Sequence, residues 1–218
     1  MSETVKKSAP DKQSAKPKKS WVYSLLRPVA GVLLKVFLPV KYHGLERLEL
    51  DPPYILIGNH TSMMDPVIMG VPVKKHQITF IGKKELCKNK LIAAFFKSMH
   101  MIPVDRHNSD MEAMRACMRV TREGGILGIF PEGTRHHEGL MTEMESGTAL
   151  IALRSKVPLI PVYIAGKVKF LRRLHVYVGE PIPMDDLREE GVNRETCDKL
   201  MKRITEAYAA LQETHTKA

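Results

Sequence analysis

The feature that most constrains the fold is a regular alternation of short apolar runs with longer amphipathic segments, from about residue 54 onward. The apolar runs are rich in β-branched residues, which is typical of buried strands, and the segments between them have apolar residues at helical spacing. This alternation predicts an α/β fold, a single domain with a largely parallel central sheet flanked by helices. The predicted strands are Tyr54–Ile57, Ile78–Ile81, Met101–Val104, Ile126–Phe130, Leu159–Ile164 and His175–Val178, and the predicted helices are Pro66–Met69, Glu85–Ser98, Asp110–Arg122, Met144–Ser155 and Asn193–Gln212, with Asn193 as the N-cap of the last.

The first forty residues follow a different pattern. Residues 1–20 contain six lysines and almost no large apolar side chain, so they predict a disordered basic tail. Residues 21–40 have an amphipathic helical pattern interrupted by Pro28, which predicts two short helices with basic residues on the polar side. These helices could pack on the domain core or lie on a membrane surface, and the neighbouring basic tail favours the membrane. The remaining residues, 41–218, form the predicted main domain.

The charge of the chain limits its partners. The 218 residues carry a formal net charge of +10, which suits nucleic acid, anionic lipid or phosphorylated small molecules. We find no sequence motif of a nucleic-acid-binding fold and expect no nucleic-acid partner. The lysines of residues 74–106 alternate with large apolar residues, a pattern suited to an anionic membrane surface or an acidic carrier protein.

The sequence also suggests a cellular location. Its three cysteines are widely separated, which is typical of a reducing compartment, and the polar N-terminus lacks the pattern of a cleavable signal peptide. No uncharged run is long enough to cross a bilayer, so we expect no spanning helix. We therefore expect a peripheral or monotopic protein on the cytoplasmic face of a membrane.

Polar residues follow three of the predicted strands, where ligands bind in sheets of this kind. The first cluster includes His60 and Asp65, which could meet if Thr61–Met64 form a turn and Asp65 begins the next helix. A carboxylate bonded to one imidazole nitrogen leaves the other nitrogen as a base. The pair could then activate a hydroxyl supplied by the substrate, although a loop histidine beside a helix-capping aspartate would give the same spacing.

The other two clusters carry arginines. Arg106 and Arg135 could each present a planar guanidinium to phosphate oxygens, and Glu132 beside Gly133 could hold a hydroxyl or orient Arg135. Each of these residues alone would be an ordinary surface charge. Three such clusters at strand ends within one domain favour a binding site.

Four ordered blocks of this sequence resemble those of the glycerolipid acyltransferases, over about residues 40–180. The blocks are Asn59-His60 with Asp65 five positions after the histidine, Val104-Asp105-Arg106, Phe130-Pro131-Glu132-Gly133-Thr134-Arg135, and Val157-Pro158-Leu159-Ile160-Pro161. The third block is highly specific, and the confirming context that a motif requires is present in the other three.

The resemblance implies transfer of a fatty acyl group from acyl-CoA or acyl-carrier protein to the sn-2 hydroxyl of lysophosphatidic acid, which makes phosphatidic acid in phospholipid biosynthesis. It makes residues 41–218 an acyltransferase domain, with His60 and Asp65 as catalytic residues. It implies that Arg106, Glu132, Gly133, Thr134 and Arg135 bind substrate. Pro161 and its neighbours are expected to form a strand and a wall of the acyl or substrate pocket.

Other functions remain open from the sequence. Glu145 stands where many members of that family have a lysine, so the acceptor could be glycerol 3-phosphate or another lysolipid. A basic nucleic-acid-binding domain and a non-catalytic lipid-binding domain are alternatives of other classes. His136-His137-Glu138 lacks further ligands at zinc spacing, so we expect a solvated loop there, with no metal and no cofactor beyond the acyl thioester.

Overall fold

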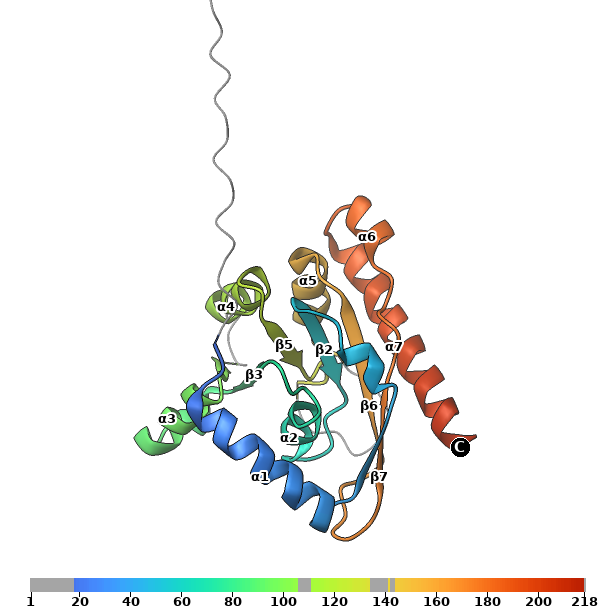
Figure 1. Cartoon of the computed structure of the whole chain (residues 1–218). Helices are drawn as coiled ribbons and strands as arrows, with labels where there is room; N and C mark the ends of the chain where they lie inside the picture. The colour runs from blue at the N-terminus through green and yellow to red at the C-terminus, as the bar shows by residue number, and fades with distance from the viewer. Residues whose placement is uncertain (1–17, 106–110, 134–140, 142–143, 218) are drawn as a thin grey trace, which may run out of the picture.

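The computed structural model describes residues 18–105, 111–133, 141 and 144–217, and its centre is a seven-stranded sheet (Figure 1). The strand order is β1-β7-β6-β2-β5-β3-β4. The last five strands in that order run parallel to one another, while β1 and β7 are parallel to each other and β7 is antiparallel to β6. The predicted, largely parallel sheet is therefore confirmed. The strands are β1 (Val40–His43), β2 (Tyr54–Gly58), β3 (Ile78–Lys83), β4 (Ile102–Val104), β5 (Ile126–Ile129), β6 (Leu159–Ala165) and β7 (Leu174–Val178).

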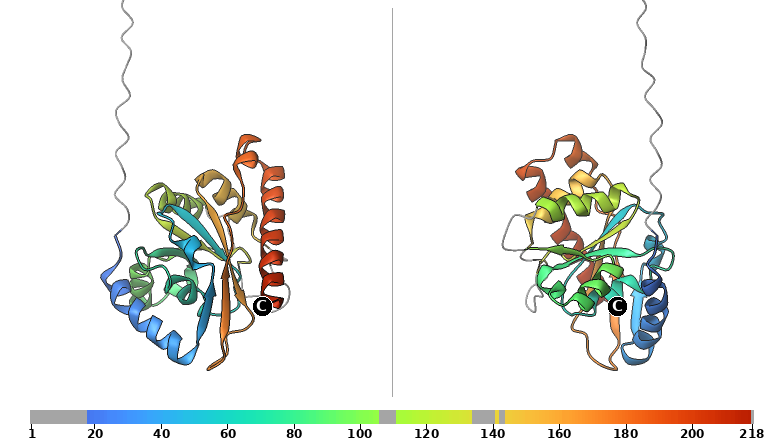
Figure 2. Two further views of the ribbon diagram at one scale, coloured as in Figure 1. Left: turned by 45° about the vertical axis from the view of Figure 1, so that its right-hand side comes forward. Right: turned by 90° about the vertical axis from the view of Figure 1, so that its left-hand side faces the viewer.

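Helices cover both faces of the sheet, as the two views of Figure 2 show. One face packs against α1 and α2, and the other packs against α4, α5 and α7. The helices are α1 (Trp21–Phe37), α2 (Asp65–Gly70), α3 (Lys90–Ser98), α4 (Met111–Arg122), α5 (Ser146–Ser155), α6 (Asp185–Glu189) and α7 (Arg194–Thr216), with short 3₁₀ helices η1 (Leu45–Leu48) and η2 (Lys84–Cys87).

The central strands are buried on both faces, which explains their continuous apolar sequences. In β2, Ile55 and Ile57 join the apolar cluster beneath α5 and α7, while Tyr54 and Leu56 join the cluster beneath α1 and α2. This division follows from the two-residue period of a strand. The two clusters are the two halves of the hydrophobic core, and β2 separates them.

The sequence pattern does not predict the three short elements β1, η1 and α6, and one predicted helix is divided. The edge strand β1 carries the exposed Lys41 and too few residues for a clear alternating pattern, and α6 is only five residues long. Residues 85–98 form η2 and α3 rather than one helix. The division occurs because the Asn89 side chain accepts hydrogen bonds from the backbone N–H groups of Leu91 and Ile92, which caps a new helix at Lys90.

The prediction of two short helices in residues 21–40 is wrong, because α1 is one helix that contains Pro28. A proline inside a helix removes one backbone hydrogen bond and crowds the preceding turn. Tertiary contacts on both sides of Pro28 hold the helix together. Before it, Tyr23 donates a hydrogen bond to the Gly70 carbonyl and Arg27 donates one to the Val71 carbonyl; after it, Leu34 is buried.

The apolar stripe of α1 points away from the domain. The side of the helix that carries Tyr23, Arg27 and Leu34 packs on α2 and the core, so Arg27, one of the basic residues expected on the polar side, contacts the domain. The helix therefore packs on the domain, as one of the two alternatives expected, but with the side opposite its apolar stripe. Its seven residues are 44–78% exposed: Trp21, Leu25, Val29, Val32, Leu33, Val36 and Phe37. Within the described part of the chain, no helix has the length and apolar character needed to cross a membrane.

Candidate active site

His60 and Asp65 meet just beyond the carboxyl end of β2. The strand ends at Gly58, a turn follows, and Asp65 is the first residue of α2, as the sequence analysis required for the two side chains to meet. His60 Nδ1 lies 2.8 Å from Asp65 Oδ2, and the two side chains are 16% and 0% exposed. Because an ionised carboxylate only accepts hydrogen bonds, this contact places the proton on Nδ1 and leaves the Nε2 lone pair free.

Backbone groups hold the Asp65 carboxylate in place. Asp65 Oδ2 accepts hydrogen bonds from the backbone N–H groups of Thr61 and Ser62, each at 2.7 Å. These donors compensate a buried charge that would otherwise be costly. The turn between β2 and α2 therefore folds around the carboxylate and fixes the direction in which it meets the imidazole.

The Asn59 side chain links the residue before His60 to the neighbouring strand β6. Its side chain is 3% exposed; Nδ2 donates to the Ile164 carbonyl at 3.0 Å, and Oδ1 accepts from the Ile164 N–H at 2.7 Å. The amide thus extends the hydrogen bonding between β2 and β6 where their regular pairing ends, at Gly58. This contact spans 105 residues of sequence, so local patterns did not reveal it.

Replacing Asn59 by leucine should destabilise the fold. The variant Asn59→Leu keeps a similar volume but leaves a buried N–H and a buried C=O of Ile164 without their partner, at about 1–3 kcal/mol for each group. We expect the free energy of unfolding to fall by about 2–4 kcal/mol in urea titrations. Gln212→Leu, which removes an exposed amide from α7, is the control and should change it by less than about 0.5 kcal/mol. Equal stability of the two variants would contradict the role of Asn59.

Glu132 holds the backbone of His60. Its carboxylate is buried, and Oε2 accepts a hydrogen bond from the His60 N–H at 2.8 Å while Oε1 accepts one from the Met141 N–H at 3.1 Å. The resemblance implies that this side chain binds substrate, and nothing local in the sequence indicates its contact with His60, 72 residues away. In the structure Glu132 holds the backbone N–H groups of His60 and Met141.

Tyr208 of α7 links the strands β2 and β6 through its hydroxyl group. Its hydroxyl donates to the Ile57 carbonyl at 2.7 Å and also lies 3.3 Å from the Val162 carbonyl oxygen. Burial, followed by the nearby Glu132 carboxylate, raises the pKa of Tyr208 well above its usual 10, so the group stays a neutral donor. The contact fixes the end of β2 just before the turn that carries His60.

An aromatic surface supports the His60 ring. The imidazole stacks on Phe130 with ring centroids 4.3 Å apart, and Phe130 stacks in turn on Phe80 at 5.8 Å. Gly58 makes room for this packing, because a Cβ at that position would lie 2.6 Å from Met69 Sδ and 3.2 Å from the Phe130 ring. The ring of His60 is therefore fixed by packing as well as by Asp65.

Gly133 is required by its backbone and by its neighbour. It has φ +67°, a left-handed conformation that favours glycine, and a Cβ there would lie 3.0 Å from Glu145 Cγ. Glu145 precedes α5, and its N–H donates to the Pro131 carbonyl at 2.8 Å. The acidic side chain that distinguishes this sequence thus lies beside the predicted substrate-binding loop. Three other predicted substrate-binding residues, Arg106, Thr134 and Arg135, and the segment His136–Glu138 lie outside the described residues.

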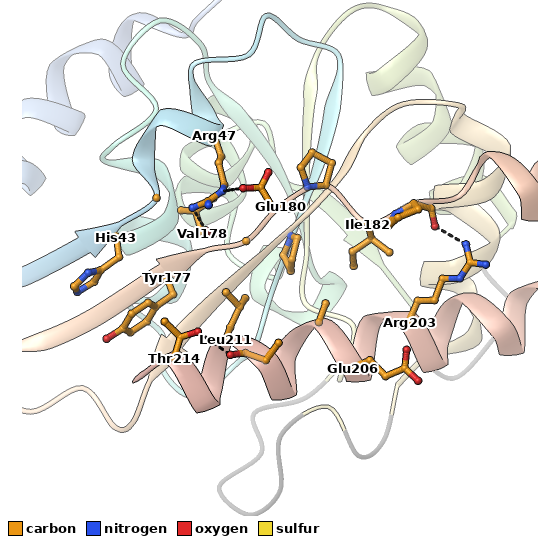
Figure 3. Close-up of a pocket in the computed structure, with 17 residues that line it drawn as sticks. His43, Arg47, Tyr177, Val178, Glu180, Ile182, Arg203, Glu206, Leu211 and Thr214 are labelled. Carbon is orange, nitrogen blue, oxygen red and sulfur yellow. Dashed lines mark hydrogen bonds and ion pairs between the residues drawn. The ribbon is translucent and has the colours of Figure 1, made fainter. Parts of the chain in front are cut away.

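Pro161 lines a groove on the other face of the sheet (Figure 3). The groove has a volume of about 710 Å³ and lies between β7 and α7, with Leu211 and Ile182 among its apolar walls. His60 stacks on Phe130, which packs with the cluster beneath α1 and α2, so the sheet separates the histidine from this groove. Pro161 is therefore a wall of a groove that His60 and Asp65 do not reach.

The arrangement can perform general-base chemistry on a hydroxyl. A buried carboxylate orients an imidazole, and its backbone and ring are fixed by Glu132 and Phe130. An enzyme with such a pair can activate a hydroxyl that the substrate supplies. In agreement, the chain belongs to the acyltransferase family: the model of that family matches residues 39–165, which include the strands and loops of the site.

Individual proteins within and beyond that match show which named enzymes the chain is similar to. The chain is 32% identical over 170 residues to the 1-acyl-sn-glycerol-3-phosphate acyltransferase of Bacillus subtilis, covering 76% of this chain and 84% of the relative. It is 29% identical over 199 residues to the enzyme of the same name from Streptococcus pneumoniae, covering 88% and 73%. Its fold resembles the crystal structure of the lysophosphatidic acid acyltransferase PlsC of Thermotoga maritima, with a TM-score of 0.65 at 22% identity, covering 89% of this chain and 78% of the other.

Proposed function

We propose that this chain is a 1-acyl-sn-glycerol-3-phosphate acyltransferase that makes phosphatidic acid from lysophosphatidic acid. The observation that carries the proposal is the buried Asp65 carboxylate on His60 Nδ1, which leaves Nε2 as the base for a substrate hydroxyl. The names of the two relatives that cover most of this chain support the acceptor, and the family match over the site supports the reaction.

The reaction is an exchange of a thioester for an ester. His60 Nε2 removes the proton from the sn-2 hydroxyl as the oxygen attacks the thioester carbonyl, and Asp65 stabilises the imidazolium that forms. The tetrahedral intermediate then breaks its C–S bond, and the proton passes from His60 to the departing thiolate. The products are phosphatidic acid and the free thiol of coenzyme A or of the acyl-carrier protein.

In this proposal the acceptor is bound by residues of the second and third sequence blocks. Arg106 and Arg135 are the cations proposed to hold the phosphate, together with Gly133 and Thr134. Glu132 serves indirectly, because its two oxygens hold the backbone at His60 and Met141. Glu145 lies beside Gly133. Its negative charge would disfavour an acceptor that places more negative charge near Gly133 than lysophosphatidic acid does.

A competition assay tests the proposal. Purified protein is given lysophosphatidic acid, glycerol 3-phosphate and lysophosphatidylcholine together, with acyl-CoA in one series and acyl-carrier protein in another. Mass spectrometry of the products is expected to show phosphatidic acid as the main product in at least one series. Acylation mainly of glycerol 3-phosphate or lysophosphatidylcholine would assign a different acceptor, and no acylation in either series would refute the proposal.

We also infer that the enzyme lies on a membrane surface through α1 and α3. The exposed apolar face of α1 is continued by Leu91, Ile92 and Phe95 of α3, which are 82%, 46% and 44% exposed. Buried Gln77 joins the two helices: its Oε1 accepts from the Ser20 N–H at 2.8 Å, and its Nε2 donates to the Ser98 carbonyl at 3.1 Å. An exposed apolar face of this size favours insertion at a bilayer interface.

The charge around these helices favours anionic lipid. The exposed lysines near α1 and α3 are Lys18, Lys19, Lys35, Lys74, Lys75, Lys83, Lys84, Lys88, Lys90 and Lys97. Each contributes about 1 kcal/mol at most near an anionic surface. The three free cysteines, Cys87, Cys117 and Cys197, suit the reducing cytoplasmic face of that membrane.

Vesicle flotation should show the contribution of α1. We expect the protein to float with vesicles of phosphatidylcholine and phosphatidylglycerol, and to bind less well as salt increases. The triple variant L25S/V29S/V36S should weaken binding at least about tenfold, because three exposed apolar side chains are lost from the inserted face. The control L50S/V192S removes two exposed apolar side chains that lie outside α1 and α3 and should bind normally. Equal binding by both variants would contradict the assignment of α1.

A further inference from the structure

The loop between β6 and β7 carries an exposed apolar tip flanked by cations. The tip is Phe170 and Leu171, which are 69% and 63% exposed. The flanking residues Lys167, Lys169, Arg172 and Arg173 are exposed as well. Large apolar side chains between cations, all open to solvent, match the chemistry of an anionic lipid surface, which offers negative headgroups above an apolar interior.

The protein holds this tip in place. Leu171 has φ +58°, a left-handed conformation that is unfavourable for a leucine. The Leu171 N–H donates a hydrogen bond to the Phe37 carbonyl at 2.8 Å, and the Phe170 ring stacks on the Phe37 ring with centroids 5.6 Å apart. The strained conformation is thus maintained by contacts with the last residue of α1, while both apolar side chains stay in solvent.

The tip extends the apolar face of α1. Phe37 belongs to the exposed stripe of that helix, so its stacking with Phe170 joins the two surfaces. Figure 2 shows the loop beside the carboxyl end of α1, whose other end lies near α3. One surface therefore runs from α3 along α1 to the β6–β7 loop.

The loop also begins next to the catalytic turn. β6 is parallel to β2 and ends at Ala165, and the Asn59 side chain bonds to the backbone of Ile164. The residue after Asn59 is His60. A membrane contact at this loop would therefore bring the catalytic edge of the sheet close to the bilayer that contains an acylated acceptor.

We propose that the β6–β7 loop is a second membrane contact, in which Phe170 and Leu171 insert into an anionic bilayer and the four flanking cations bind lipid headgroups. The inference rests on the proposed attachment through α1. α3 lies near the amino end of α1, and the loop adds a contact at the carboxyl end, so the domain is held at both ends of the helix. The His60 edge then faces the lipid surface.

Two single-tryptophan proteins test each contact separately. The natural chain has one tryptophan, Trp21, which is 78% exposed on α1. In the variant W21F/F170W the only tryptophan is at the tip of the loop. On vesicles of phosphatidylcholine and phosphatidylglycerol, we expect the emission of both proteins to shift to shorter wavelength and to be quenched by lipids brominated on their acyl chains.

Binding of loop variants gives a second measurement. F170S/L171S should weaken vesicle binding at least about tenfold, since both inserted side chains are lost. K167Q/K169Q should weaken it roughly fivefold for each charge removed at low salt, and less at high salt. The control L50S/V192S should bind as the natural chain does. Urea unfolding of each variant establishes that it is folded.

The outcomes separate the loop from the proposed function. A tryptophan shift at residue 21 without one in W21F/F170W would overturn the loop and leave the α1 contact, and no shift in either protein would overturn both contacts. Acyl transfer to a short-chain, monomeric lysophosphatidic acid needs no membrane, so F170S/L171S should retain that activity. Failure of the natural chain in that soluble assay would refute the proposed function, whatever the emission measurements show.

Discussion

His60→Ala is expected to lower kcat/KM for acyl transfer by about 10²–10⁴-fold, the usual contribution of a general base. The imidazole is the group that Asp65, Phe130 and the Glu132–backbone contact all fix in place. Its removal takes away the proton acceptor that these contacts orient. The measurement is initial rate against lysophosphatidic acid concentration, on protein whose urea unfolding curve shows that it is folded.

The control for this variant is His215→Ala. His215 lies near the end of α7, on the face of the sheet away from His60, where its Nδ1 is 3.1 Å from the Tyr177 hydroxyl. It should retain activity within about twofold, because surface changes away from a site have small effects. If His60→Ala kept activity within a few-fold of the natural chain, His60 would not be the base, and the mechanism would be wrong.

Asp65→Asn should reduce kcat by about 10²–10⁴-fold with only a few-fold change in KM, because the substitution acts on the histidine. The Asn oxygen can still accept the bonds from Thr61 and Ser62 that shape the turn. In the other orientation of the amide, its nitrogen takes the place of Asp65 Oδ2, loses the two backbone bonds and donates to His60 Nδ1, which places the ring proton on Nε2 and removes the base. The loss of the negative charge also leaves the imidazolium unstabilised in the transition state.

A double-mutant cycle distinguishes this role from a merely structural one. Since Asp65 is proposed to act through His60, D65N should have little further effect on the residual activity of H60A. If D65N lowered the activity of H60A by its full factor, Asp65 would act independently of the histidine. Unfolding curves for both single variants and the double variant show whether a change of stability contributes.

The alternating apolar pattern predicted the parallel core of the sheet because those strands are buried on both faces and their apolar runs are continuous. The pattern failed at β1, a short edge strand with the exposed Lys41, and within residues 85–98, where Asn89 caps a new helix. Both failures have the same cause. Short or half-exposed elements have few apolar residues, and their limits are decided by single side-chain hydrogen bonds.

In the candidate site, too, some contacts were predictable from the sequence and others were not. The meeting of His60 and Asp65 was predictable because the two residues are five positions apart and a strand end, a turn and a helix start lie within residues 58–65. The contacts of Asn59 with Ile164 and of Glu132 with His60 join residues 105 and 72 positions apart. No local pattern specifies such pairs, since the packing of the whole sheet brings them together.

The sequence by itself determined the α/β class of this protein, the pairing of His60 with Asp65 and the family to which the chain belongs. Each of these follows from the order and spacing of residues along the chain. The tertiary structure decided that the apolar stripe of α1 faces outward, that Glu132 holds the histidine, and that the β6–β7 loop lies against Phe37. Periodicity shows that a helix has an apolar side, but only the packing of distant segments decides whether that side meets the core or the solvent.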